Sequence, residues 1–314
     1  MSSVIPRPGR LFVALAAAGL LLTGCGTGPG QPGAAAVVGG ETIPVSDVRS
    51  WFDGLLAKEQ GVKPELQAQG QMDDVARNIA TLTVREKLAE RAARAENITV
   101  SDNRVSEEIA ARGGAEAATR GQIYTPRNFR DGVRAQLIAT ELGRKYADRL
   151  AVTFDYTQAT TRSDAEHKAR RMAAGAEETR KVIAEDAAAG LPAMEGERLR
   201  AAETPEVNAL AAATPLFAAD PGTVLAFQGQ QAGQWLVARI TERRTDARGP
   251  APAPMDQETL QALGTQLLAL TGERVGVELS PRYGVWDPIA LATAPNEGET
   301  TGFRYSDSEN LGRS

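Results

Sequence analysis

The chain has 314 residues and a net charge of −5, and it contains one histidine and one cysteine. A mildly acidic chain with charges of both signs is poorly suited to binding nucleic acid or to adhering to anionic lipid by charge alone. So few histidines and cysteines disfavour zinc sites and Ser-His-Asp triads, and no phosphate-loop or nucleophile-elbow motif is present, so we expect no metal and no cofactor.

The first 25 residues have the features of an export signal. Residues 1–10 carry two arginines and no acidic residue, and residues 11–22 form an apolar stretch too short to cross a bilayer. The following Thr-Gly-Cys, which ends at Cys25, resembles the lipobox of bacterial lipoproteins, whose cysteine is lipidated and becomes the new N-terminus. We therefore predict a lipoprotein signal peptide at 1–24 and a lipid anchor on Cys25, which places the protein on the extracytoplasmic face of the cell membrane. An ordinary secretory signal with a stray cysteine is the alternative.

A flexible tether and a mainly helical domain are predicted next. Residues 25–36 are rich in Gly and Pro, which is typical of a linker. Residues 37–150 combine a short strand pair with helices, because their apolar residues recur at helical spacing. The helices are expected from Ser46, from Met72 to Ala95, from Ser101 to Gly113 and from Thr125 to about Leu150.

The pattern changes at Ala151. Strands are expected at 152–157, 223–227 and 234–240, and one helix at 163–189. A Pro-rich linker at 249–254 precedes a leucine-rich helix, and a compact turn and strand follow at 280–288. The tail at 295–314 is polar and lacks apolar periodicity, which predicts disorder.

Three local sequences resemble the SurA/PrsA class of envelope foldases. Residues 37–43 match the V-x-G-x-x-I strand and turn that precede the first helix of that class. Residues 95–102 are similar to its G-I-x-V-S-D linker, with Asn97 in place of glycine, and residues 280–287 are similar to the end-piece of envelope lipoproteins with a SurA-type N-terminal region. The resemblance extends over about residues 36–290.

This resemblance implies an α+β fold that is mostly helical. A SurA-like helical chaperone domain would be built from residues 37–150 together with a C-terminal helix and strand at 255–290. A small parvulin-like α+β insert would occupy residues 151–248.

The insert departs from active parvulins, which carry a histidine in the first strand and another in the last. Here the first strand contains Phe154, Asp155 and Tyr156, the last contains no histidine, and His167 lies in the predicted helix. Enzymatic activity is therefore disfavoured. Any such activity would be peptidyl-prolyl isomerisation, with Asp155 and Tyr156 in place of the usual polar groups.

The function implied by the resemblance is that of a membrane-tethered chaperone, a holdase or assembly factor that binds unfolded or nascent secreted proteins. An active prolyl isomerase and a scaffold lipoprotein with one defined envelope partner are the alternatives. The candidate client-binding residues are aromatic: Trp51, Phe52, Phe129, Tyr146 and Trp286. Because aromatic residues make up only 5% of the chain, a role in the core is the favoured interpretation of these five.

Overall fold

The structure is a computed structural model that describes residues 32–59, 61–229 and 233–306. The predicted signal peptide and Cys25 lie outside these residues. Helices and antiparallel sheets are both present, which confirms the predicted α+β class. No helix of the described part is both long and apolar enough to span a bilayer.

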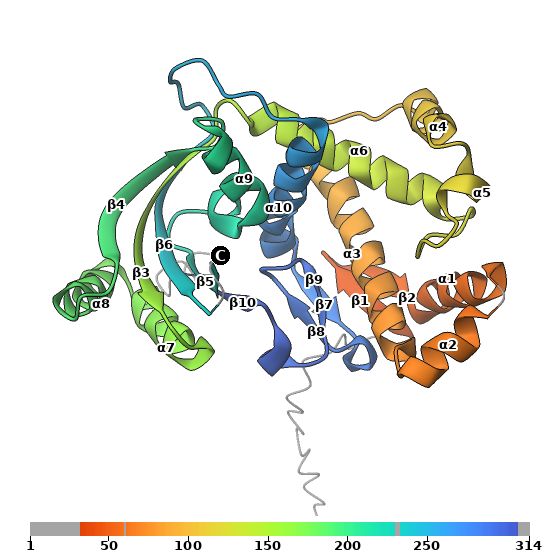
Figure 1. The fold of residues 1–314 in the computed structure, drawn as a ribbon, viewed down its shortest axis with the longest axis horizontal. Coiled ribbons are helices and arrows are strands. Elements are labelled where there is room, and N and C mark those ends of the chain that lie inside the picture. The colour runs from red at the N-terminus through yellow and green to blue at the C-terminus, as the bar shows by residue number, and fades with distance from the viewer. Residues whose placement is uncertain (1–31, 60, 230–232, 307–314) are drawn as a thin grey trace, which may run out of the picture.

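Helices dominate the first half of the fold (Figure 1). Their bounds are α1 Val45–Lys58, α2 Val62–Gln69, α3 Met72–Glu96, α4 Asp102–Ala111, α5 Ala115–Ala118 and α6 Phe129–Tyr146. Strands β1 (Ala34–Val38) and β2 (Glu41–Pro44) form an antiparallel hairpin ahead of α1. Strand β1 begins inside the predicted tether at 25–36, because the small side chains of Ala34, Ala35 and Ala36 are buried in the core. The tether prediction is therefore too long at its C-terminal end.

A strand from late in the chain completes the N-terminal hairpin. Strand β7 (Val277–Leu279) pairs antiparallel with β1 and directly follows α10 (Gln257–Val275). Helix α10 crosses α6 where Gly143 and Gly264 bring the two backbones together. The hairpin of β8 (Val285–Asp287) and β9 (Ala292–Ala294) then packs against α3 through β9.

The middle of the chain forms a five-stranded antiparallel sheet of order β10-β5-β6-β3-β4. Its elements are β3 Ala151–Ala159, α7 Arg162–Ala173, α8 Ala176–Ala188, β4 Ala193–Arg200, α9 Pro205–Ala213, the 3-10 helix η1 Pro215–Ala218, β5 Val224–Gln228, β6 Trp235–Arg244 and β10 Gly302–Tyr305. The single helix predicted over 163–189 is two helices, because Gly175 adopts a φ of 132° between α7 and α8.

The tail is ordered over its first part. Strand β10 pairs antiparallel with β5, with Phe303 opposite Ala226. Phe303 and Tyr305 alternate as strand residues do, and both pack on the cluster formed by α7 and the sheet. The prediction of disorder is therefore wrong for residues 295–306, and residues 307–314 lie outside the described part.

One hydrophobic core extends from the N-terminal helices into the sheet. It includes Leu88 of α3, Leu263 of α10 and Phe154 of β3, all of them buried. Helix α10 lies between the two parts of the fold and contacts α6 on one side and α9 and η1 on the other. Helices α7 and α8 cover the opposite face of the sheet with a second, smaller cluster. The inner face of the sheet thus shares its core with the N-terminal helices.

Candidate functional site

Two of the five candidate client-binding aromatics are core residues. The side chains of Trp51 and Phe129 are 8% and 5% exposed. The ring of Tyr124 lies against both, with centroids 5.0 Å from Trp51 and 6.1 Å from Phe129. The Trp51 indole also donates to the carbonyl oxygen of Ile123 at 2.9 Å. Neither side chain is available to a client in this structure, which corrects the client-binding assignment for these two.

The other three aromatics are half-buried and lie in separate places. Phe52 lines a small cavity of about 270 Å³ between α1 and α3. The Tyr146 hydroxyl donates to Glu96 Oε2 at 2.5 Å, and burial together with this carboxylate raises the pKa of Tyr146 to about 12. Trp286 of β8 lines a surface cavity beside Arg162. The structure therefore does not assemble the five into one groove.

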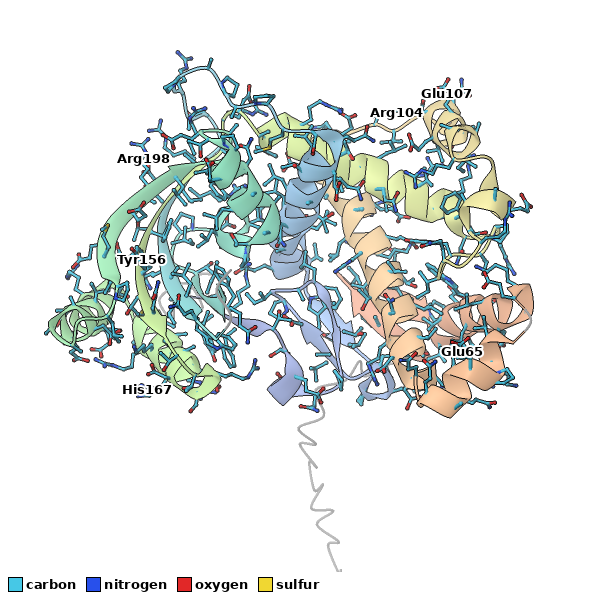
Figure 2. The ribbon with its side chains drawn as sticks, viewed as in Figure 1. Glu65, Arg104, Glu107, Tyr156, His167 and Arg198 are labelled. Atoms are coloured by element: carbon cyan, nitrogen blue, oxygen red, sulfur yellow. The ribbon has the colours of Figure 1, made fainter. Side chains whose placement is uncertain are left out.

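The two strand residues that would replace a parvulin's polar groups support the sheet instead. Asp155 Oδ1 accepts a hydrogen bond from the backbone N–H of Gly196 at 2.8 Å, across the irregular part of the β3–β4 pairing. Tyr156 packs near Phe154, with ring centroids 5.9 Å apart. Neighbouring strand residues point to opposite faces, so Asp155 and Tyr156 do not converge on one site. His167 is exposed on α7 (Figure 2).

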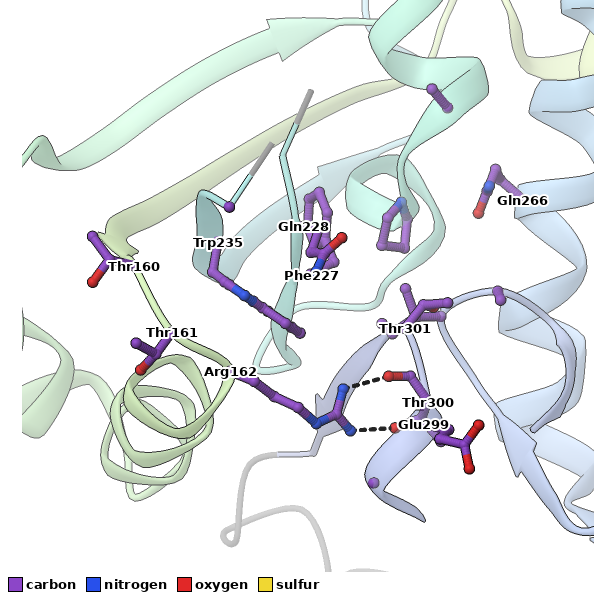
Figure 3. A pocket seen from close by; sticks show the side chains of 16 residues that line it. Thr160, Thr161, Arg162, Phe227, Gln228, Trp235, Gln266, Glu299, Thr300 and Thr301 are labelled. Carbon is purple, nitrogen blue, oxygen red and sulfur yellow. Dashed lines mark hydrogen bonds between the residues drawn. The ribbon is translucent and has the colours of Figure 1, made fainter. Parts of the chain in front are cut away.

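A cleft of about 720 Å³ lies beside the β5–β6 hairpin, and we call it the sheet cleft (Figure 3). Its apolar walls come from η1, the sheet and the segment after β8. The principal lining residues are Arg162, Pro215, Phe227, Trp235, Gln266 and Ile289, and residues 298–301 close its rim. The lining of the sheet cleft is mixed, since polar and charged residues make up about half of it. A concave site in which several polar groups converge beside apolar side chains is a candidate ligand or peptide site.

Gln266 of α10 provides an unused hydrogen-bond acceptor at this cleft. Its Oε1 atom is buried and has no hydrogen-bond partner among the described residues. A buried polar atom without a partner costs about 1–3 kcal/mol. A rotation of the Gln266 side chain that brings Oε1 to a donor in the cleft, such as a peptide N–H group, would remove this cost.

Arg162, the first residue of α7, holds the C-terminal segment, which we define as residues 296–306. The guanidinium donates to the carbonyl oxygen of Thr300, to Thr300 Oγ1 at 2.6 Å and to the carbonyl oxygen of Glu297 at 2.9 Å. Its Cζ atom also lies 4.4 Å from the ring centroid of Phe303 and 5.7 Å from that of Trp235. A planar guanidinium can bond in its plane and contact aromatic rings with its faces.

Sequence analysis missed this arrangement around Arg162. No local motif marks an arginine at the start of a helix as an anchor for a segment about 135 residues away. The available signal was the alternation of Phe303 and Tyr305 around Arg304, which is typical of a strand.

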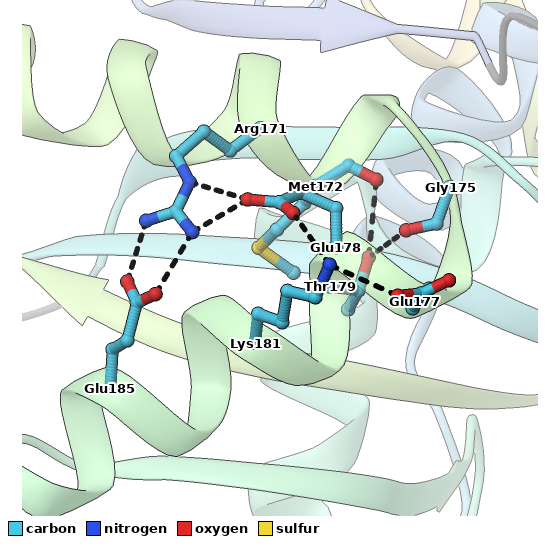
Figure 4. Close-up of polar contacts among 8 residues, drawn as sticks. All are labelled: Arg171, Met172, Gly175, Glu177, Glu178, Thr179, Lys181 and Glu185. Atoms are coloured by element: carbon cyan, nitrogen blue, oxygen red, sulfur yellow. Dashed lines mark hydrogen bonds and ion pairs between the residues drawn. The ribbon is translucent and has the colours of Figure 1, made fainter.

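Ion pairs join the two helices that cover the outer face of the sheet (Figure 4). Arg171 of α7 bonds to Glu178 and Glu185 of α8, each at 2.6 Å. Thr179 Oγ1 donates to the carbonyl oxygens of Met172 and Gly175 at 3.1 and 3.0 Å. These contacts fix α8 on α7, and α7 carries Arg162 at its start.

A second cavity of about 640 Å³ lies between α1, α3 and the start of α6. Glu86 of α3 lines it and accepts a hydrogen bond from the Tyr124 hydroxyl at 3.4 Å. Burial, and then the charge of Asp131, raise the pKa of Glu86 to about 8. At neutral pH this carboxyl group is mostly protonated, so it can donate as well as accept a hydrogen bond.

Comparison with known proteins finds one family model that matches the N-terminal part of the chain. Residues 9–143 match the family model of the SurA-like N-terminal domain. The match confirms the resemblance to SurA/PrsA-type foldases. No curated protein matches the sequence.

Two solved structures are similar to most of the chain. The foldase protein PrsA from Lactococcus lactis is 14% identical with a TM-score of 0.26, and the match covers 78% of this chain and 94% of that one. The foldase protein PrsA from Streptococcus pneumoniae is 14% identical with a TM-score of 0.22, and the match covers 75% and 90% of the two chains.

Proposed function

We propose that the protein is a membrane-tethered extracytoplasmic chaperone that holds unfolded or nascent secreted proteins. The observation that carries the proposal is the SurA-like N-terminal domain at 9–143. The PrsA proteins with similar structures are named foldases, which agrees with this function. The lipid anchor is inferred from the lipobox-like motif whose last residue is Cys25.

The surface of the fold favours weak contact with clients through clefts and sheet edges. Among the large hydrophobic residues that the structure describes, only Met194 is largely open to solvent, at 48% exposed. A broad apolar face for clients is therefore not presented in this conformation. The sheet cleft is instead lined by the nearly buried rings of Phe227 and Trp235 and by Gln266, whose buried Oε1 atom has no hydrogen-bond partner among the described residues.

We propose a holdase in preference to a prolyl isomerase. Isomerisation requires a shaped, polar-edged pocket that binds the twisted amide more tightly than either planar form. Asp155 bonds to the backbone of β4, and Tyr156 packs on Phe154, so these residues supply no such pocket.

The test is an aggregation assay and an isomerase assay on one sample of the chain from residue 26 onward. We expect an equimolar amount to slow the aggregation of a chemically unfolded model protein, while the cis-trans relaxation of X-Pro peptides keeps its uncatalysed rate. Clear catalysis would replace the holdase with an isomerase. Loss of both activities in a folded sample would overturn the chaperone proposal.

A further inference from the structure

We propose that the outer edge of β5 is a docking surface for an extended client segment, and that the C-terminal segment covers this edge in the free protein. The nature of the partner rests on the proposed function. The mode of binding rests on the structure: an extended chain adds a strand to a sheet edge through main-chain hydrogen bonds.

Strand β10 shows how an extended chain lies on this edge. Gly302 is opposite Phe227, and Tyr305 is opposite Val224, in antiparallel register. A Cβ atom at position 302 would lie 2.2 Å from the carbonyl oxygen of Ala226. The first position of the added strand therefore has to lack a side chain, and glycine satisfies this requirement.

Side chains on both faces of the sheet beside this edge determine which residue types fit after the glycine. Phe303 lies under the guanidinium of Arg162, at 4.4 Å from ring centroid to Cζ. Arg304 is nearly buried, donates to the carbonyl oxygen of Ala218 at 3.1 Å and pairs with Glu273. The partner that fits is thus an extended segment with glycine, an aromatic residue and arginine in succession.

The C-terminal segment can leave the edge of β5 without separating any other strands of the sheet. Strand β10 is the outermost strand of the five-stranded sheet, and residues 296–299 and 301 are exposed. The sheet cleft beside it has a volume of about 720 Å³, and Gln266 Oε1 finds no donor there among the described residues. A client longer than the C-terminal segment would occupy the edge and the cleft together.

The test uses the full chain with Gly302→Val, which forces the segment off the edge, and a fluorescent peptide of residues 296–306 as the probe. We expect the peptide to bind the variant at least tenfold more tightly than the wild-type chain, in which the edge is covered. A peptide with valine at position 302 should bind neither chain. Ser306→Val adds similar bulk at an exposed position and should behave as the wild type.

Failure of the native peptide to bind a folded Gly302→Val chain would overturn the proposal, as would equal binding of the valine peptide. Should the variant fail to fold, hydrogen exchange of the wild-type chain decides the matter. We expect the amides of β10 to exchange at least tenfold faster than those of β6. If the amides of β10 and of β6 both exchange only through global unfolding, β10 does not leave the sheet in the folded protein, and the proposal is overturned.

Two further measurements separate this inference from its alternatives. A wild-type dimer joined through exchanged C-terminal segments would assign the edge to a second copy of the chain and would contradict a client site. If the wild type suppresses aggregation but the peptide does not bind the folded variant, the chaperone function stands and only the docking surface is refuted. We expect Gly302→Val to suppress aggregation at a severalfold lower molar ratio than the wild type.

Discussion

At the scale of single residues, the carboxyl group of Glu86 makes the stability of the fold depend on pH. Its ordinary pKa is 4.5, and burial raises the pKa to about 8 in the folded chain. Below pH 4.5 the group is protonated in both states and has no effect on stability. Between these values the unfolded chain releases the proton and the folded chain keeps it, so stability falls by about 1.4 kcal/mol per pH unit as pH rises.

Glu86→Gln should abolish this decline, because the amide keeps the shape and the acceptor for Tyr124 without a charge to bury. The difference in free energy of unfolding between the variant and the wild type should therefore increase by roughly 2–4 kcal/mol, in favour of the variant, as the pH rises from 5 to 8. Urea unfolding at the two pH values measures the difference. Glu107→Gln, at an exposed position of α4, is the control and should leave the pH dependence unchanged. Parallel pH profiles for Glu86→Gln and the wild type would show that Glu86 is not the group responsible.

At the scale of elements, the crossing of α6 and α10 depends on two glycines. A Cβ atom at Gly264 would lie 1.7 Å from the carbonyl oxygen of Ala139, and one at Gly143 would lie 1.9 Å from that of Leu260. Both obstacles are backbone atoms, which cannot move aside as a flexible side chain can. The glycines therefore set how closely the N-terminal helices approach α10, and through α10 how they meet the sheet.

Gly264→Ala should destabilise the chain although alanine is the better helix former. Alanine usually gains about 1 kcal/mol over glycine inside a helix, but separating two packed helices costs on the order of 1–3 kcal/mol or more. Gly272→Ala in the same helix is the matched control, because its nearest atom, Leu88 Cδ1, would be 3.7 Å away. We expect thermal unfolding to shift downward for the first variant and to stay level or rise for the second. Equal shifts would contradict a steric role for Gly264.

Elements with strong local signals could be predicted from the sequence. Helix α3 was expected from Met72 to Ala95 and occupies Met72–Glu96, because apolar spacing defines its buried face and Asn97, at a φ of 54°, ends it. Strand β10 could not be predicted in this way, because it is stabilised by β5 and Arg162, which are distant in sequence. The sheet cleft could not be predicted for the same reason, since its lining comes from η1, the sheet, the segment after β8 and residues 298–301, together with Arg162 of α7 and Gln266 of α10.

At the scale of the whole molecule, the predicted anchor at Cys25 decides where the fold operates. Cys25→Ser should release the protein from the membrane fraction, because serine cannot accept the thioether-linked lipid. Detergent phase partition would measure the loss of membrane association, and labelling with a fatty acid would measure the loss of the lipid. We expect the free energy of unfolding of the released protein to match that of the wild type. Thr23→Ser keeps a small residue before the cysteine and should remain membrane-bound; continued membrane association of Cys25→Ser would refute the lipid anchor.

The pairing of β1 with β7 and of α6 with α10 affects how a newly made chain folds. About 110 residues separate the end of α6 from the start of α10. Under the proposed export, α10 crosses the membrane after the whole of the sheet region up to β6, so the N-terminal helices wait for the helix that covers them. Throughout that interval Leu88 and its neighbours in α3 are uncovered. Each new copy of the protein therefore passes through the same vulnerable state that we propose it guards in others.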